Sequence, residues 1–262
     1  MSSAIRNRIL AQVRPVLLET WGYSLSALPA SGLEVVPAKQ PDGPLAVRTD
    51  GGGLLLAEPQ WLEAWQELSA TVTMEQLFSI FGVFELARST LPDGISVFGP
   101  VWYFLADRQA LNPAPSAAVE VLAETALRRL DPATYWHCST DSAARGFAVR
   151  DAGKVAALAT VWQNPDTLWE IGVDVLPGAQ GRGHGRAVVS AAAEWALGHS
   201  PVVVYTTGAF NIPSTRTALS LGLRHIWTTI KRTSGQFVVP PGPLGNPLPD
   251  VVPQAYWQDY PE

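Results

Sequence analysis

Residues 169–186 read WEIGVDVLPGAQGRGHGR, an apolar segment followed by a glycine-rich loop and then by a helical pattern. The segment up to Leu176 is typical of a β-strand, and Pro177 is expected to end it. Apolar residues recur at helical spacing over residues 183–197, so the sequence predicts a helix directly after the loop. The stretch therefore predicts a strand, a loop with four glycines and a helix in immediate succession.

This succession predicts an anion-binding loop. The first N–H groups of a helix have no partner within the helix and carry a partial positive charge, and glycine lets the backbone approach an anion closely. Arg182 and Arg186 flank the helix start, where cations are disfavoured by about 0.3–1 kcal/mol each. A bound phosphate would turn that penalty into an attraction. The alternative interpretation is a tight turn with two solvated arginines.

Two common phosphate motifs do not fit the stretch. A nucleoside-triphosphate P-loop needs Gly-Lys-Ser/Thr, whereas Gly185 is followed by Arg186 and Ala187. A dinucleotide fingerprint needs a third glycine where Val188 stands and an acid about twenty residues on, and residues 201–211 contain no acid. P-loop and Rossmann-type binding are therefore excluded.

The same stretch resembles the GNAT superfamily of acetyl-CoA-dependent N-acetyltransferases. The family signature, Gln/Arg-x-x-Gly-x-Gly/Ala, is matched at every fixed position by QGRGHG at residues 180–185. In the family's order, VLP at residues 175–177 precedes the signature, and NIPS at 211–214 and ALSLGL at 218–223 follow it. The resemblance covers residues 147–227.

The resemblance implies an α/β (α+β) fold, with a mixed, mostly antiparallel sheet flanked by helices. The sheet would splay between its fourth and fifth strands, and acetyl-CoA would bind there as co-substrate. Backbone amides of the signature would bind its pyrophosphate, and the preceding strand edge, disturbed by a bulge, would pair with the pantetheine arm. Asn211 would contact the cofactor or, alternatively, only cap the following helix with Ser214. The implied cofactor-binding residues are Val173, Asp174, Val175, Gln180, Gly181, Arg182, Gly183, His184, Gly185, Arg186, Asn211 and Ser214.

Candidates for catalysis are few. Glu170 lies on the strand that commonly supplies the family's glutamate, but five residues before Val175, where six is more usual. Because side chains alternate along a strand, that offset could turn it to the other face. Glu170 is therefore either the general base or a structural carboxylate. Ala218 stands where the family often has its general-acid tyrosine, which leaves Tyr205, on the preceding strand, or bulk water as the acid.

His137 and Cys138 are adjacent, which suggests a nucleophile with its base. Adjacent side chains point in different directions, however, and the family transfers the acetyl group without a covalent enzyme intermediate. We therefore expect a buried structural pair. No Cys/His cluster has the spacing of a metal site, so no metal is expected.

Composition narrows the class of protein. Of 262 residues, 47% are hydrophobic and 16% charged, which is typical of a folded chain, and a net charge of −5 argues against nucleic-acid binding. The single cysteine excludes a disulfide framework and suits a reducing compartment. The apolar run at residues 97–106 is much shorter than the ~20 residues of a membrane span. We expect a cytoplasmic monomer or homodimer with an amphipathic N-terminal helix.

The chain is expected to contain three parts. They are an N-terminal α/β extension at residues 1–94, a GNAT-like domain at 95–235 with core motifs at 147–227, and a proline-rich tail at 236–262 whose aromatic residues dock on the body. Further elements are expected at the following positions: strands at 45–48 and 54–57, a helix that opens with a capping box at Thr73 and Gln76 and carries Leu77, Ile80, Phe81 and Phe84 inward, and a helix over 119–130.

These observations favour an N-acetyltransferase that moves an acetyl group directly from acetyl-CoA to a primary amine of a small molecule or peptide. A catalytically inactive acyl-CoA-binding or sensing module is the alternative, and an O-acyltransferase on the same scaffold is a third. The sequence does not identify the acceptor.

Overall fold

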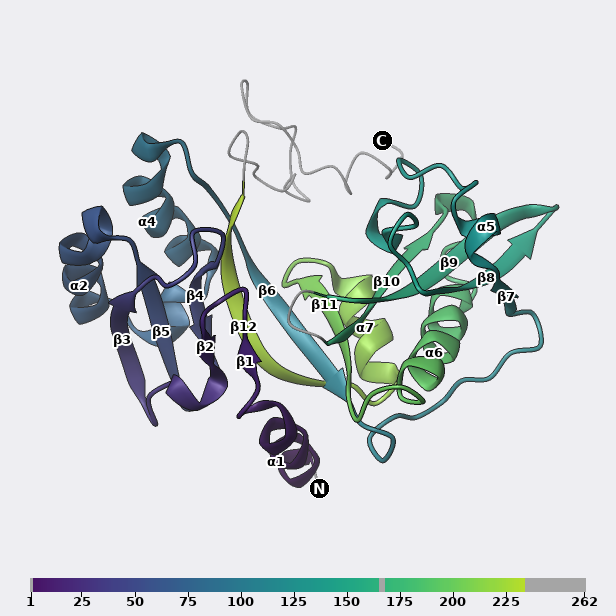
Figure 1. Ribbon diagram of the computed structural model, residues 1–262, viewed down its shortest axis with the longest axis horizontal. Coiled ribbons are helices and arrows are strands. Elements are labelled where there is room, and N and C mark those ends of the chain that lie inside the picture. The colour runs from purple at the N-terminus through teal and green to yellow at the C-terminus, as the bar shows by residue number, and fades with distance from the viewer. Residues whose placement is uncertain (1, 165–167, 234–262) are drawn as a thin grey trace. The chain divides into compact units, whose positions relative to one another are not determined.

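The computed structural model describes residues 2–164 and 168–233 (Figure 1). The chain forms two compact units, and each is built from separate stretches of sequence. Unit 1 comprises the described residues up to Glu19 together with Trp102–Ile226, and unit 2 comprises Thr20–Val101 with the described residues from Trp227 onward. The expected docking of the tail at 236–262 concerns residues outside the described ranges.

Unit 1 contains the glycine-rich stretch and a mixed sheet with the strand order β6-β11-β10-β9-β8-β7. Pairing is antiparallel between β7 and β8, β8 and β9, and β9 and β10, and it is parallel between β10 and β11. The mostly antiparallel α/β architecture is thus confirmed. The elements of unit 1 are α1 (Ser2–Val13), β1 (Leu17–Leu18), the end of β6 (Ser96–Ala106), β7 (Glu120–Leu122), α5 (Glu124–Leu127), η4 (Trp136–Cys138), β8 (Arg145–Asp151), β9 (Lys154–Gln163), β10 (Trp169–Val175), η5 (Pro177–Ala179), α6 (His184–Ala196), β11 (Val203–Gly208), α7 (Ile212–Ser220) and the start of β12 (Arg224–Thr233).

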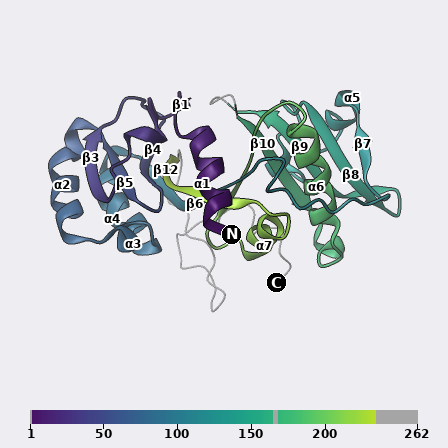
Figure 2. The ribbon, with the colours of Figure 1, turned by 90° about the horizontal axis from the view of Figure 1, so that it is seen from below.

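Helix α6 packs along β8, β9 and β10 of unit 1 (Figures 1 and 2). Its buried face consists of small and β-branched side chains, which let the helix approach the sheet closely. That packing fixes the N-terminus of α6 at the end of β10. The buried residues of α6 are Val188, Val189, Ser190, Ala192, Ala193 and Ala196.

Unit 2 has the strand order β3-β5-β4-β12-β6. The strands expected at residues 45–48 and 54–57 are confirmed as β4 and β5, which pair antiparallel. Strand β5 begins earlier than expected, at Gly52, where a Cβ would collide with the Pro29 carbonyl oxygen. The elements of unit 2 are β2 (Tyr23–Ser24), η1 (Leu25–Ala27), β3 (Gly32–Pro37), β4 (Pro44–Arg48), β5 (Gly52–Ala57), η2 (Pro59–Trp61), α2 (Leu62–Thr71), α3 (Met74–Leu77), α4 (Ile80–Thr90), η3 (Leu91–Asp93), the start of β6 and the end of β12.

The helix expected to open at Thr73 is two helices. The capping box of Thr73 and Gln76 is confirmed, but α3 ends at Leu77, and Ser79 caps a new helix, α4. The restart changes the helical phase. Gly82 then packs directly on the Leu77 main chain, where a Cβ would not fit.

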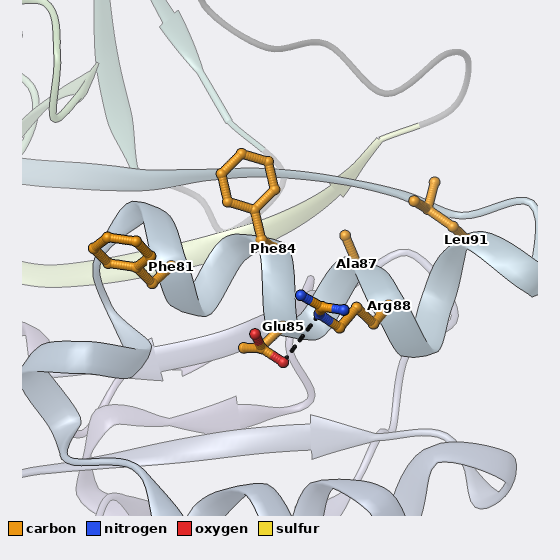
Figure 3. Close-up of a pocket in the computed structure, with 6 residues that line it drawn as sticks. All are labelled: Phe81, Phe84, Glu85, Ala87, Arg88 and Leu91. Atoms are coloured by element: carbon orange, nitrogen blue, oxygen red, sulfur yellow. Dashed lines mark ion pairs between the residues drawn. The ribbon is translucent and has the colours of Figure 1, made fainter.

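The expected inward orientation is consequently wrong for three of the four apolar residues. Leu77 is fully buried, but Ile80, Phe81 and Phe84 are exposed, and Val83 and Leu86 take the buried positions. Phe81 and Phe84 line a surface pocket of about 310 Å³ together with Glu85, Ala87, Arg88 and Leu91 (Figure 3).

The helix expected over residues 119–130 is also wrong. Residues 120–122 form strand β7, which pairs with β8, and only one helical turn, α5, follows. Val121 is exposed, while Leu122 and Leu127 are buried in a cluster with Tyr135 and Cys138. None of the helices in the described ranges is long and apolar enough to cross a bilayer.

Candidate functional site

Strands β10 and β11 separate halfway along β10. They pair only from Trp169 opposite Val203 to Ile171 opposite Tyr205. On its other edge β10 pairs with β9 along its whole length, as far as Val175 opposite Ala157. Residues 172–175 thus extend past the parallel pairing, as the resemblance implies for a strand edge that binds an extended ligand. The register between β9 and β10 shows no shift. The expectation of a bulge is therefore wrong for this pair of strands.

The glycine-rich loop continues directly from this edge. Gly181 and Gly183 adopt positive φ angles of 73° and 80°, which favour glycine. A Cβ at either position would meet nothing within 4 Å, so the surface above the loop is open. Helix α6 then begins at His184, and no side chain caps it.

Most main-chain amides of the loop have no hydrogen-bond acceptor among the described residues. The amide of Gln180 donates to Pro177 O at 3.3 Å, but in the described ranges no acceptor takes a hydrogen bond from the amides of residues 181–185. The Gln180 side chain donates to Val175 O at 3.4 Å, and a Cβ at Gly185 would lie 3.1 Å from Val175 Cγ2, so the loop packs close to the end of β10. Open space and unsatisfied amides at a helix N-terminus fit a diphosphate.

One of the two loop arginines has a partner that the sequence pattern did not reveal. Arg182 forms an ion pair with Asp151 at 2.9 Å, and both side chains are about half exposed. An exposed pair of this kind contributes little stability and can exchange for a stronger anionic partner. Arg186 is exposed on the first turn of α6. The loop thus keeps a local positive charge in a chain of net charge −5.

Glu170 lies on the same face of β10 as Gly172 and Asp174, since side chains alternate along a strand. Its carboxylate is held on both oxygens: Oε1 accepts from the Thr206 hydroxyl at 2.7 Å, and Oε2 accepts from Asn164 Nδ2 at 3.1 Å. Thr206 belongs to β11, so this hydrogen bond links the two strands just beyond their last pair.

Asp174 does more than contribute its main chain to the strand edge. One carboxylate oxygen accepts from the His137 amide at 3.0 Å, and the other contacts Nδ1 of the same residue. The expectation of a buried structural pair is confirmed for Cys138, which is fully buried, and burial together with the nearby Asp174 charge raises the pKa of its thiol well above the usual value. It is wrong for His137, whose side chain is 33% exposed.

Tyr205 is buried on β11, on the face opposite to that of Thr206. Its hydroxyl forms a hydrogen bond of 2.7 Å with Ser214 Oγ in the first turn of α7. Burial raises the pKa of Tyr205 to about 12, against the smaller opposing effect of the Ser214 hydrogen bond. Ser214 lies one turn before Ala218, the position of the family's usual tyrosine, so Tyr205 directs a protonated hydroxyl toward this part of α7.

Asn211 caps α7. Its side chain accepts from the amide of Ser214 at 3.1 Å, which confirms the capping interpretation. A contact between Asn211 and a cofactor stays a prediction. Within the described residues no group of three or more histidine, cysteine or acidic side chains could hold a metal ion.

The model of the acetyltransferase (GNAT) family matches residues 109–223. None of the curated proteins matches this chain.

Three GNAT proteins are among the solved structures to which this chain is similar. A GNAT-family protein from Novosphingobium aromaticivorans is 20% identical, with a TM-score of 0.44 over 55% of this chain and 68% of that one. A GCN5-related N-acetyltransferase-like protein from Streptococcus suis is 11% identical, with a TM-score of 0.44 over 89% of this chain and 100% of that one. A GNAT-family acetyltransferase from Colwellia psychrerythraea is 12% identical, with a TM-score of 0.42 over 68% and 75%.

The signature at residues 180–185 and the separated strands both lie within the matched range. Over residues 109–223 the chain is therefore similar to the acetyltransferase (GNAT) family.

Proposed function

We propose that the chain is an acetyl-CoA-dependent N-acetyltransferase that transfers the acetyl group directly to a primary amine of a small molecule or peptide. The observation that carries the proposal is the separation of β10 from β11 beside a loop whose amides at 181–185 face no acceptor in the described chain. One end of this arrangement suits a diphosphate, and the other suits an extended chain of amides. Coenzyme A combines both groups. The proposal also includes a cytoplasmic location, on the basis of the single cysteine.

Each part of the site has a binding role in this proposal. The amides of residues 181–185 and the start of α6 would hold the diphosphate, with Arg182 and Arg186 adding charge. The free edge of β10 from Gly172 to Val175 would hydrogen-bond the pantetheine amides, and a main-chain N–H near Val175 would polarise the thioester carbonyl. Bound acetyl-CoA supplies a thioester carbon that accepts the amine nitrogen. Fixing amine and thioester together accounts for a large part of the expected rate.

Proton transfer completes the reaction. An acceptor that arrives as an ammonium ion loses two protons as a C–N bond replaces the C–S bond: one goes to a base, and the other to the sulfur of coenzyme A. Tyr205 is the candidate acid for the sulfur, because its raised pKa keeps the hydroxyl protonated at neutral pH. Glu170 is the candidate for contact with the amine, and its two hydrogen bonds hold its charge in place on the face of β10.

The proposal is tested by ligand identification and an activity screen. Mass spectrometry of the ligand that copurifies with the chain should detect coenzyme A or an acyl form of it, and a panel of primary amines should yield amides from acetyl-CoA. Glu170→Gln, which removes the charge but keeps the shape, should lower acetyl transfer at least tenfold and leave coenzyme A affinity within twofold.

Other results of these experiments would favour a different function. Tight acetyl-CoA binding without turnover of any amine would favour the inactive acyl-CoA-binding module, and an ester product would indicate an O-acyltransferase. A chain that binds no coenzyme A in calorimetry would contradict the proposal.

A further inference from the structure

The His137 ring is fixed by a carboxylate from a neighbouring element. Both oxygens of Asp174 on β10 accept from His137 in η4, one from its amide at 3.0 Å and one from its ring at Nδ1. An ionised carboxylate can only accept hydrogen bonds, so Nδ1 must carry the ring proton. The neutral ring therefore has its lone pair on Nε2, which makes Nε2 the basic atom of the side chain.

This ring lies over the part of β10 that has separated from β11. Asp174 is three residues beyond Ile171, the last residue of β10 that pairs with β11. The main chain of His137 covers Gly172 so closely that a Cβ there would collide with its carbonyl oxygen, and the Trp162 ring lies next to it. His137 therefore lies on the face of β10 that also carries Glu170 and Asp174.

The segment that carries the ring is anchored on both sides of His137. Trp136 stacks on the ring with centroids 3.6 Å apart, and its own side chain is 38% exposed. On the other side, the Cys138 thiol donates to Leu158 O at 3.4 Å, and the Thr160 hydroxyl donates to Cys138 O. These contacts hold the imidazole in one orientation while a third of it is exposed, as a proton-transfer group requires.

We propose that His137 is the general base of the acetyl transfer and that Asp174 is its positioning residue, an inference that rests on the proposed function. A proton leaves the acceptor ammonium for Nε2, and the electron pair stays on the nitrogen, where it forms the bond to the acetyl carbon. The C–S bond breaks, and the sulfur of coenzyme A takes the second proton of the nitrogen. The imidazolium is stabilised by Asp174 and releases its proton to solvent. An aromatic wall of Trp136 and Trp162 beside two carboxylates suits an acceptor that carries a cationic amine.

Glu170, the other candidate base, is held by two hydrogen bonds. Its oxygens accept from Thr206 and Asn164. The titratable groups that face or electrostatically influence the His137 region include Asp174 and Glu170 of β10, Arg150 of β8, Asp131, Tyr135 and Cys138 of its own segment, and Tyr205 of β11. Burial raises the pKa of each of the last three, so they stay neutral at pH 7. Asp174 is a charged group in direct contact with the ring.

The tautomer of His137 gives a test that needs no substrate. In the protein alone, long-range ¹H–¹⁵N NMR should show His137 with its proton on Nδ1. Asp174→Asn should reverse this. The His137 amide needs an oxygen acceptor, so the Asn amide group must turn its NH₂ toward the ring, and Nδ1 then becomes the acceptor.

The kinetic test uses His137→Gln with His199→Gln as the control. His199 lies after α6, and its ring contacts Trp195 O at 2.8 Å. His137→Gln should keep acetyl-CoA affinity within twofold but lower kcat/KM for an amine about 10²–10⁴-fold at pH 7. The difference in kcat/KM between the variant and the unmodified chain should shrink as the pH approaches about 10, where the amine loses its proton without a base. His199→Gln should match the unmodified chain at every pH.

Three outcomes would overturn the inference. One is a proton on Nε2 in the unmodified chain, and another is a His137→Gln variant with the original pH profile. The third is a high-pH recovery seen in Glu170→Gln but not in His137→Gln. Each of these leaves acetyl-CoA binding and the proposed function intact. Absence of acetyl-CoA binding by the unmodified chain would instead contradict the proposed function, and this inference with it.

Discussion

At the scale of single residues, Gly183 is the position on which the loop depends most. It is the N-cap of α6, its φ is 80°, and a Cβ at this position would meet nothing within 4 Å. A left-handed conformation costs other residues about 1–2 kcal/mol, so glycine is needed for the backbone. The open space above it has no use in packing. Backbone and surroundings together leave room for a ligand above Gly183.

Gly183→Glu should abolish coenzyme A binding without unfolding the chain, because it places a side chain and a negative charge where the diphosphate would lie. The matched control is Gly94→Glu in unit 2, where φ is 74° and a Cβ again meets nothing within 4 Å. Both variants should lose a similar 1–2 kcal/mol of unfolding free energy, roughly the cost of the conformation. Calorimetry should show binding only in the Gly94→Glu variant. Equal affinity in the two variants would refute the loop assignment.

The catalytic contacts at this scale mostly join residues far apart in sequence. His137 and Asp174 are 37 positions apart, and Arg182 and Asp151 are 31 apart. Local patterns predict the proposed diphosphate-binding loop, because strand, loop and helix follow one another directly in residues 169–186. They do not predict the proposed base, because no pattern within a loop reports what packs against it. His137 was visible as a candidate, but the partner that orients its ring was not.

At the scale of elements, α4 shows how one helix restart changes which residues are buried. Ser79 accepts from the Phe81 amide at 3.2 Å and caps a new helix that begins at Ile80, three residues after α3 ends at Leu77. Val83, Leu86 and Ala87 then join the core of unit 2, while Phe81 is 73% exposed. Helical spacing counted continuously from α3 into α4 predicts the wrong buried face for α4. The 119–130 segment was mispredicted for a related reason, since its β-strand pairing with β8 outweighs its helical spacing.

Paired alanine substitutions in α4 measure how much a buried and an exposed apolar residue contribute to stability. Leu86→Ala removes a fully buried side chain and should lower the unfolding free energy by about 2–5 kcal/mol. Phe81→Ala removes a larger side chain from the surface and should change it by no more than about 0.5 kcal/mol. Urea titrations of both variants give the comparison. A loss for Phe81→Ala as large as that for Leu86→Ala would mean that Phe81 belongs to the core.

At the scale of the whole molecule, the two units are not consecutive parts of the sequence. Helix α1 belongs to unit 1, where Arg8 pairs with Asp107 at 2.7 Å, and the end of β12 belongs to unit 2. The expectation of a domain boundary between residues 94 and 95 rests on composition. Composition does not show that a terminal segment packs with a unit distant in sequence. The acetyltransferase-family match at residues 109–223 falls entirely within unit 1. The residues to which the proposed reaction assigns a role all lie in that unit.

An NMR titration of the backbone amides with coenzyme A tests the binding role of the glycine-rich loop. If the main-chain donors of the glycine-rich loop hold the diphosphate, the amides of residues 181–185 should show the largest shifts and saturate with the calorimetric affinity. Saturable binding that leaves those five amides unmoved would contradict the account.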